Sequence, residues 1–165
     1  MIKKILVALL IALPLCASAQ KFGTIDGSAI LPQMPEFTAA NTQIEEASKK
    51  YEAEATKLRE EIDKKMADFQ TLSEDASTPE SIKQRRVQEL TEMQQKYEQF
   101  IQTAQQDLQR QQAQLMQPIQ EKLMNAITSV GQENGFTLIF PVDAAAYAGQ
   151  DVIDVTPLVK TKLGI

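Results

Sequence analysis

The sequence predicts a mainly α protein with a small β body, in which a long antiparallel helical hairpin forms a coiled-coil arm. Two long runs of helical character, 36–76 and 79–134, fill more than half of the 165 residues. One tight turn separates them, and β-type runs occur only near the two ends of the mature chain. The apolar residues fall in stripes along the helices, so they can be buried only against another helix or another copy of the chain.

The first nineteen residues are typical of a secretory signal peptide. Lys3 and Lys4 give a positive start, 5–15 is an apolar run, and 17–19 supplies the small residues of a cleavage site. The apolar run is shorter than the about 20 residues that cross a bilayer. We expect export, with cleavage after Ala19 and a mature chain that begins with the next residue.

Cys16 leaves a second interpretation open. A lipidated cysteine ends the signal of a lipoprotein, but Leu15 stands where the lipid-transfer motif takes a small residue. Cleavage after Ala19 removes the only cysteine, and no disulfide, thiol nucleophile or thiolate metal ligand then remains. The mass of the mature N-terminus distinguishes the two interpretations.

Charge and composition exclude several classes of function. The chain has 17 basic and 22 acidic side chains, and loss of Lys3 and Lys4 leaves 15 − 22 = −7. Such an acidic surface argues against a nucleic-acid partner, because binding a phosphate backbone relies on Lys and Arg. There is no His, no glycine-rich phosphate loop and no paired-cysteine motif. We therefore predict no catalytic residue, no cofactor, no metal site and no enzyme activity.

The mature chain should open with a short strand at 22–26, which Gly27 ends. Pro32 and Pro35 exclude a continuous helix through the next segment, so the first long helix is expected to begin after Pro35. Its apolar residues recur at steps of three and four, as in a coiled-coil seam. These residues are Phe37, Ala40, Ile44, Ala47, Tyr51, Ala55, Leu58, Ile62, Met66, Phe69 and Leu72.

A turn near residue 78 is expected to separate the two helices. Pro79 suits the first position of a helix, since its missing N–H would be unpaired there, and Glu80 suits the positive end of the helix dipole. The second seam consists of Leu90, Met93, Tyr97, Ile101, Ala104, Leu108, Leu115, Ile119, Leu123, Ala126 and Val130. Folding back at the turn places Pro35 level with Pro118, where we expect a kink.

This pairing divides the chain into three parts. A signal peptide covers 1–19, a small β/α body that mediates oligomerisation covers 20–34 and 119–165, and the helical hairpin arm covers 35–118 with its tip near 77–80. At 1.5 Å per residue, the arm would be roughly 60 Å long.

The body is expected to hold a few short strands with open edges. Gly135 after Asn134 suits a left-handed helix cap, and a strand is predicted at 136–142 with 144–147 as its partner. The run 154–157 opens a terminal helix, because its proline suits the first turn. So small a sheet buries little surface, and it should therefore close by oligomerisation.

The chain resembles the Skp (OmpH) family of periplasmic chaperones over its whole mature length. The resemblance depends on the signal, the hairpin and an ordered series of short motifs: Ile25-Asp26, Pro118-Ile119, Ala126-Ile127, Asn134-Gly135-Phe136, Val142-Asp143, Ala145-Ala146-Tyr147 and Asp154-Val155-Thr156. It implies a periplasmic homotrimer, whose short strands form one β body that closes by trimerisation and whose hairpins surround a cavity. It further implies an ATP-independent holdase that cages unfolded outer-membrane proteins between the arms.

The net charge departs from the family pattern. Well-known members are basic and attract acidic clients and lipopolysaccharide by charge, whereas this chain is acidic. We carry over no lipopolysaccharide site and expect capture by apolar contact, avidity and confinement, with at most transient contact with a membrane surface. The main alternative is a structural coiled-coil adaptor or spacer of the cell envelope, which would bind one folded partner.

Two groups of residues are candidates for these roles. The predicted oligomerisation residues of the body are Ile25, Ile127, Val130, Ile139, Phe140, Val142 and Tyr147. The predicted client contacts, near the outer end of the arm, are Met66, Phe69, Leu72, Met93, Lys83, Arg85 and Arg86. In a plainer interpretation the apolar contacts are hairpin core and the basic ones offset nearby acids. Fourteen glutamines between 84 and 120 could form weak, reversible hydrogen bonds with an exposed client backbone, but we interpret them as a solvated helix face.

Overall fold

The computed structural model describes residues 20–165, so the predicted signal peptide, its cleavage site and Cys16 lie outside the described residues. The elements are β1 (Lys21–Ile25), α2 (Gly27–Ile30), a 3-10 helix (Leu31–Gln33), α3 (Pro35–Glu74), α4 (Glu80–Asn134), β2 (Phe136–Pro141), a second 3-10 helix (Val142–Ala144), β3 (Ile153–Asp154) and α5 (Thr156–Leu163). Long helices and one small sheet confirm the predicted fold class, while closure by trimerisation stays a prediction.

The chain forms two compact units. The body unit consists of Ala126–Gly164 with the described residues up to Gly27, and the arm unit consists of Ser28–Asn125 with Ile165. The boundary between them falls inside α4. Our assignment of arm and oligomerisation body, with divisions at Pro35 and Pro118, stays a prediction.

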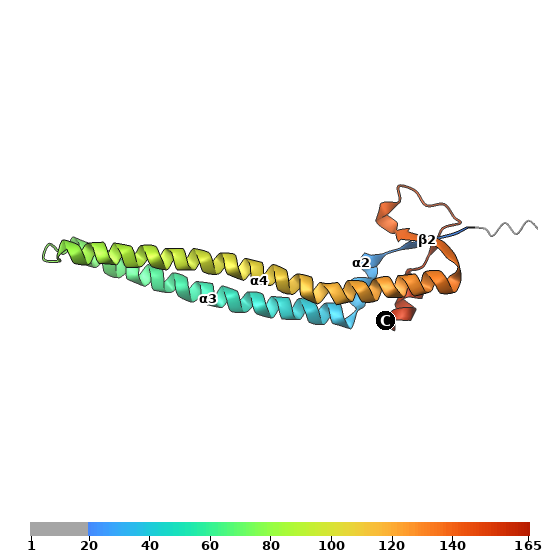
Figure 1. Cartoon of the computed structure of the whole chain (residues 1–165), viewed down its shortest axis with the longest axis horizontal. Coiled ribbons are helices and arrows are strands. Elements are labelled where there is room, and N and C mark those ends of the chain that lie inside the picture. The colour runs from blue at the N-terminus through green and yellow to red at the C-terminus, as the bar shows by residue number, and fades with distance from the viewer. Residues whose placement is uncertain (1–19) are drawn as a thin grey trace, which may run out of the picture. The chain divides into compact units, whose positions relative to one another are not determined.

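In the arm unit, α3 and α4 run side by side in opposite directions (Figure 1). Two polar contacts between the helices give their register. Glu36 forms an ion pair with Lys122, and the Tyr51 hydroxyl donates a hydrogen bond to the Asp107 carboxylate. The residue numbers of each pair add to 158, close to the alignment expected from a turn near residue 78. Helix α4 continues through Pro118 to Asn134.

The turn between the helices lies where the sequence predicts it and is organised by Asp75. One oxygen of its carboxylate accepts hydrogen bonds from the backbone N–H of Ser77 at 2.8 Å and from the Ser77 hydroxyl at 2.7 Å. Lys83 Nζ donates to the Ser73 carbonyl at 2.9 Å, which ties the first turns of α4 to the end of α3. The bond from Lys83 satisfies a carbonyl in the last turn of α3, which has no partner within its own helix.

The arm unit has a thin core. Its buried apolar residues are Ile30, Met34, Ala40, Leu90, Ala104, Ile119 and Leu123. Most other seam residues, such as Leu58, Ile62 and Tyr97, are only half-buried. Two helices cover each other along one stripe only, so a single hairpin leaves much of its apolar surface open to further contacts.

The body unit holds a three-stranded sheet in the order β2-β1-β3, with β1 parallel to both neighbours. The prediction that 144–147 pairs with the preceding strand was therefore wrong. The segment after β2 turns into a 3-10 helix at Val142–Ala144, and β2 pairs instead with β1, more than 100 residues earlier in the chain. The whole segment from α2 to α4 is the crossover connection between these two parallel strands. Strands β2 and β3 are the two edges.

Close packing around Gly23 holds the sheet to the rest of the body unit. A Cβ atom at Gly23 would lie 2.9 Å from Val155 Cγ1, 3.1 Å from Phe136 Cε1 and 3.2 Å from Ile139 Cγ1. Real Cβ atoms essentially never come as close as 2.9 Å to another heavy atom, so a larger residue here would force these side chains to shift. Gly135 has φ +69, which confirms the predicted left-handed end of α4.

The C-terminal helix is fastened to the first strand by a small polar network. The Thr156 hydroxyl accepts a hydrogen bond from the backbone N–H of Asp26 at 3.0 Å. The backbone N–H of Thr156 in turn donates to the Asp154 carboxylate at 2.9 Å, at the start of α5. Val155 and Val159 beside this network are fully buried. The predicted helix start at 154–157 is thereby confirmed.

Candidate functional site

The predicted apolar client contacts lie along the seam near the tip of the arm. Met66 is 43% exposed, whereas Phe69, Leu72 and Met93 are half-buried between the two helices. The three half-buried side chains therefore contribute to the hairpin core. Met66 is the member of this set whose surface is most open to another molecule.

Two exposed apolar side chains near the tip escaped the sequence analysis. Ile82 is 43% exposed and Val87 is 49% exposed, both in the first turns of α4. A search for seam positions does not find them, because they flank the seam rather than lie in it. Together with Met66 they make the tip richer in accessible apolar surface than the seam pattern indicates.

The predicted basic contacts are engaged within the hairpin. Arg85 Nε lies 3.2 Å from Glu89 Oε1, and Arg86 Nη1 lies 2.5 Å from Glu89 Oε2. The Arg86 guanidinium is the main cause that lowers the pKa of Glu89. Lys83 donates a hydrogen bond to the Ser73 carbonyl, so all three basic side chains have partners within the hairpin. A role in client contact stays a prediction.

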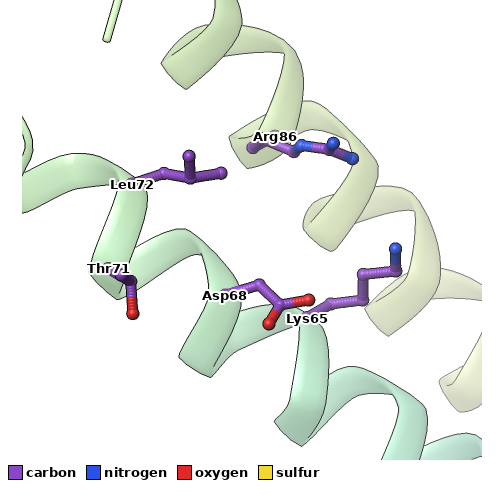
Figure 2. A pocket seen from close by; sticks show the side chains of 5 residues that line it. All are labelled: Lys65, Asp68, Thr71, Leu72 and Arg86. Carbon is purple, nitrogen blue, oxygen red and sulfur yellow. The ribbon is translucent and has the colours of Figure 1, made fainter. Parts of the chain in front are cut away.

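A hollow of about 340 Å³ opens between the helices just below the tip (Figure 2). Its lining consists of Lys65, Asp68, Thr71 and Leu72 from α3 and Arg86 from α4. Cations, a carboxylate, a hydroxyl and one leucine give it a mixed character. It is an open depression, unlike the enclosed and mostly apolar pockets that bind small molecules.

The middle of the arm has a polar interruption of the seam. The Tyr51 hydroxyl donates to Asp107 Oδ2 at 3.1 Å, and the Tyr51 and Phe100 rings lie 6.1 Å apart between centroids. The hydrogen bond to Asp107 is the main cause that raises the pKa of Tyr51. Gln111, half-buried, lines an adjacent hollow of about 470 Å³ together with Gln43, Glu46, Ala47, Lys50 and Tyr51.

A third depression, of about 370 Å³, lies where α3 begins. It is lined by Glu36, Ala39, Ala40, Gln43, Leu115, Pro118, Ile119 and Lys122. Its floor is apolar, and the Glu36–Lys122 ion pair stands at its rim. The hydrogen bond from Lys122 is the main cause that lowers the pKa of Glu36.

The predicted oligomerisation residues fall into two classes. Ile25 and Val130 are buried within the chain's own body unit, so they serve its core, and Ile127, Ile139 and Phe140 are half-buried. Val142 is 53% exposed and Tyr147 is 86% exposed. Sequence reasoning missed two further exposed apolar residues of the sheet, Leu138 and Ile153.

Within residues 20–165, no three His, Cys, Asp or Glu side chains converge as a metal ion would require. None of the helices in that same range has an apolar stretch long enough to span a bilayer. The features that remain are surfaces: an apolar tip, an interrupted seam and the open sheet of the body unit.

Comparison with known proteins matches the chain to one family. The model of a family described as outer membrane protein (OmpH-like) matches residues 21–163. A crystal structure of a candidate outer membrane chaperone (OmpH-like) from Caulobacter crescentus superposes with a TM-score of 0.74 at 13% identity, covering 87% of this chain and 83% of that one. The comparison with curated proteins gives no match.

Proposed function

Because the chain belongs to the OmpH-like family of outer membrane proteins, we propose that it is an ATP-independent holdase chaperone for unfolded outer-membrane proteins in the periplasm. The observation that carries the proposal is the long α3–α4 hairpin, whose seam is only half covered and whose tip exposes Met66, Ile82 and Val87. Such a surface offers many weak apolar contacts along its length, which suits loose binding of varied clients.

The proposed assembly is a homotrimer whose arms surround one client. Its support is the open sheet of the body unit, with β2 and β3 at the edges and Val142 and Tyr147 exposed. Exposed strand edges and apolar side chains favour association with further copies. Unfolded β-barrels also expose strand edges and apolar side chains. Isolating one chain at a time lowers the risk that they aggregate.

The proposal is tested by diluting a urea-unfolded outer-membrane β-barrel into buffer with the protein from Gln20 onward. Light scattering should stay low for at least two unrelated barrels, without ATP. A structural adaptor or spacer of the envelope would leave the aggregation of both barrels unchanged, and that result would overturn the holdase.

A shortened arm tests whether the hairpin encloses the client. Deletion of 72–87 removes the tip and with it Leu72, Ile82 and Val87. The holding capacity for a large barrel should fall more than that for a small one, since the cavity is reduced. Equal capacity of the shortened and full-length proteins for the large barrel would contradict the cage.

A further inference from the structure

The middle of α4 is unusually free of charge. The stretch 99–120 holds ten glutamines and only two charged residues, Asp107 and Arg110, which form an ion pair with each other. The facing stretch of α3, 38–59, holds eight charged residues. The two helices of the arm thus present different chemistry to their surroundings.

Half of these glutamines form one row. The row lies two positions before the α4 seam positions from Ile101 to Ile119, with Gln111 counted as a seam position, about 200° around the helix from them, and therefore faces away from α3. We call it the amide stripe; its members are Gln99, Gln102, Gln106, Gln109, Ala113 and Gln117, and all are exposed. At 1.5 Å per residue it extends about 30 Å along the arm.

The same rule applied to α3 gives a different row. Two positions before its seam lie Thr42, Glu45, Lys49, Ala53, Thr56 and Glu60, all of them exposed. Within this row, Lys49 Nζ lies 2.6 Å from Glu45 Oε1. Charged groups hold water strongly, so covering this row with another chain would cost more than covering amides.

We propose that the amide stripe is a second client-binding surface of the arm, in addition to the apolar tip, and that its ligand is the unpaired backbone of the unfolded chain. This inference rests on the proposed holdase function. A glutamine amide has two N–H donors and a carbonyl acceptor, which match the C=O and N–H groups of an unpaired strand. Within the stripe, Gln117 donates one of its N–H groups to Glu121 Oε1 at 3.0 Å. Peptide groups occur in every client, so binding there is independent of client sequence and charge.

Glutamine also fits the demands of a helical arm. It is a good helix former, unlike Asn or Ser, so the stripe keeps its geometry when it binds. Single amide bonds exchanged with water contribute little, and the client can therefore move along the stripe while many contacts hold it. Because the stripe is uncharged, binding there should depend only weakly on salt concentration.

The test compares two matched pairs of nearly isosteric substitutions. Gln102→Glu with Gln109→Glu adds two negative charges to the amide stripe, whereas Asn41→Asp with Gln70→Glu adds two to exposed positions of α3. The probe is a urea-unfolded, dye-labelled outer-membrane β-barrel of near-zero net charge. Kd is measured by fluorescence anisotropy at low and at high salt. Circular dichroism checks that both variants keep their helices.

We expect the stripe pair to weaken binding about tenfold at both salt concentrations, because carboxylates would have to lose water beneath the client. The α3 pair should leave Kd close to that of the unsubstituted protein. Equal weakening by both pairs, or no weakening by the stripe pair, would overturn the inference. So would a loss of solution mass in the stripe pair alone, since the stripe would then be a contact between copies. Failure of the unsubstituted protein to bind the barrel would instead overturn the holdase function itself.

Discussion

Tyr51 of α3 donates a hydrogen bond to Asp107 of α4 at 3.1 Å, and this polar link crosses the middle of an otherwise apolar seam. Asp107 is also paired with Arg110 on its own helix, which orients the carboxylate. Since a one-turn slip between the helices would break the link, Tyr51 and Asp107 set the register in which the arm closes.

Replacing Tyr51 by Phe removes the hydroxyl but keeps the ring beside Phe100. We expect a small fall in the melting temperature and faster amide exchange in the middle of the arm, because the polar link is lost. Tyr97→Phe is the control, since Tyr97 lies half-buried in the same seam without this link. Equal effects of the two substitutions would show that the link does not set the register.

Replacing Gly23 by Ala should destabilise the body unit. The added Cβ would meet Val155, Phe136 and Ile139 at 2.9 to 3.2 Å, and overpacking of this kind costs about 1–3 kcal/mol. Gly27→Ala is the control, because a Cβ there meets nothing within 4 Å. Urea unfolding measures both free energies, and an unchanged midpoint for Gly23→Ala would contradict the packing described.

Acid should loosen the tip of the arm. The hydrogen bonds from the Ser77 hydroxyl and then the Ser77 backbone are the main causes that lower the pKa of Asp75. A lowered pKa means that the ionised carboxylate stabilises the turn above the ordinary aspartate range, and that this contribution is lost as the pH falls through the lowered value. Amide exchange at Ser77 should therefore speed up, relative to its intrinsic rate, as the pH falls below about 4.

The Asp75→Asn variant supplies the comparison for the tip. Its amide at Ser77 should show weak protection at every pH, because the ionised acceptor is gone. Glu74→Gln, one residue earlier, should keep the pH dependence of the original protein. If Asp75→Asn retained that dependence, another group would be responsible for it.

Assembly should depend on exposed apolar residues of the body unit. Val142→Ser with Tyr147→Ser removes two apolar side chains that are 53% and 86% exposed, and we expect the apparent dissociation constant of the oligomer to rise at least about tenfold. Val87→Ser, on the arm, changes a residue of similar exposure and should leave the mass unchanged. Sedimentation velocity over a dilution series measures the mass of the oligomer for each variant. Identical masses for both variants would remove Val142 and Tyr147 from the proposed interface.

Features with local signals were predictable from the sequence. Seam periodicity gave both long helices, and the prolines and Gly135 marked their ends to within about two residues. The pairing of β2 with β1 was missed because parallel partners are joined by a long crossover, and nothing in either strand specifies its neighbour. The role of Asp75 was missed because several side chains near the tip are able to form such a turn, and only coordinates show which one does.

The candidate binding surfaces, too, were predicted only where the sequence carries a local signal. Seam positions are visible in a sequence, so Met66 and Leu72 were named, whereas Ile82 and Val87 flank the seam and were not. The glutamines were visible in the sequence, but we interpreted them as a solvated helix face. Their alignment in one row opposite the seam, against the charged row of α3, emerges when each residue is placed on its helix face.

The trimeric cage is tested most directly by the sedimentation of the protein from Gln20 onward, at micromolar concentration, with and without one unfolded outer-membrane β-barrel. We expect a mass of three chains for the protein alone, and a mass of three chains plus one barrel in the mixture. A stable, well-ordered monomer that leaves the barrel to aggregate would contradict it.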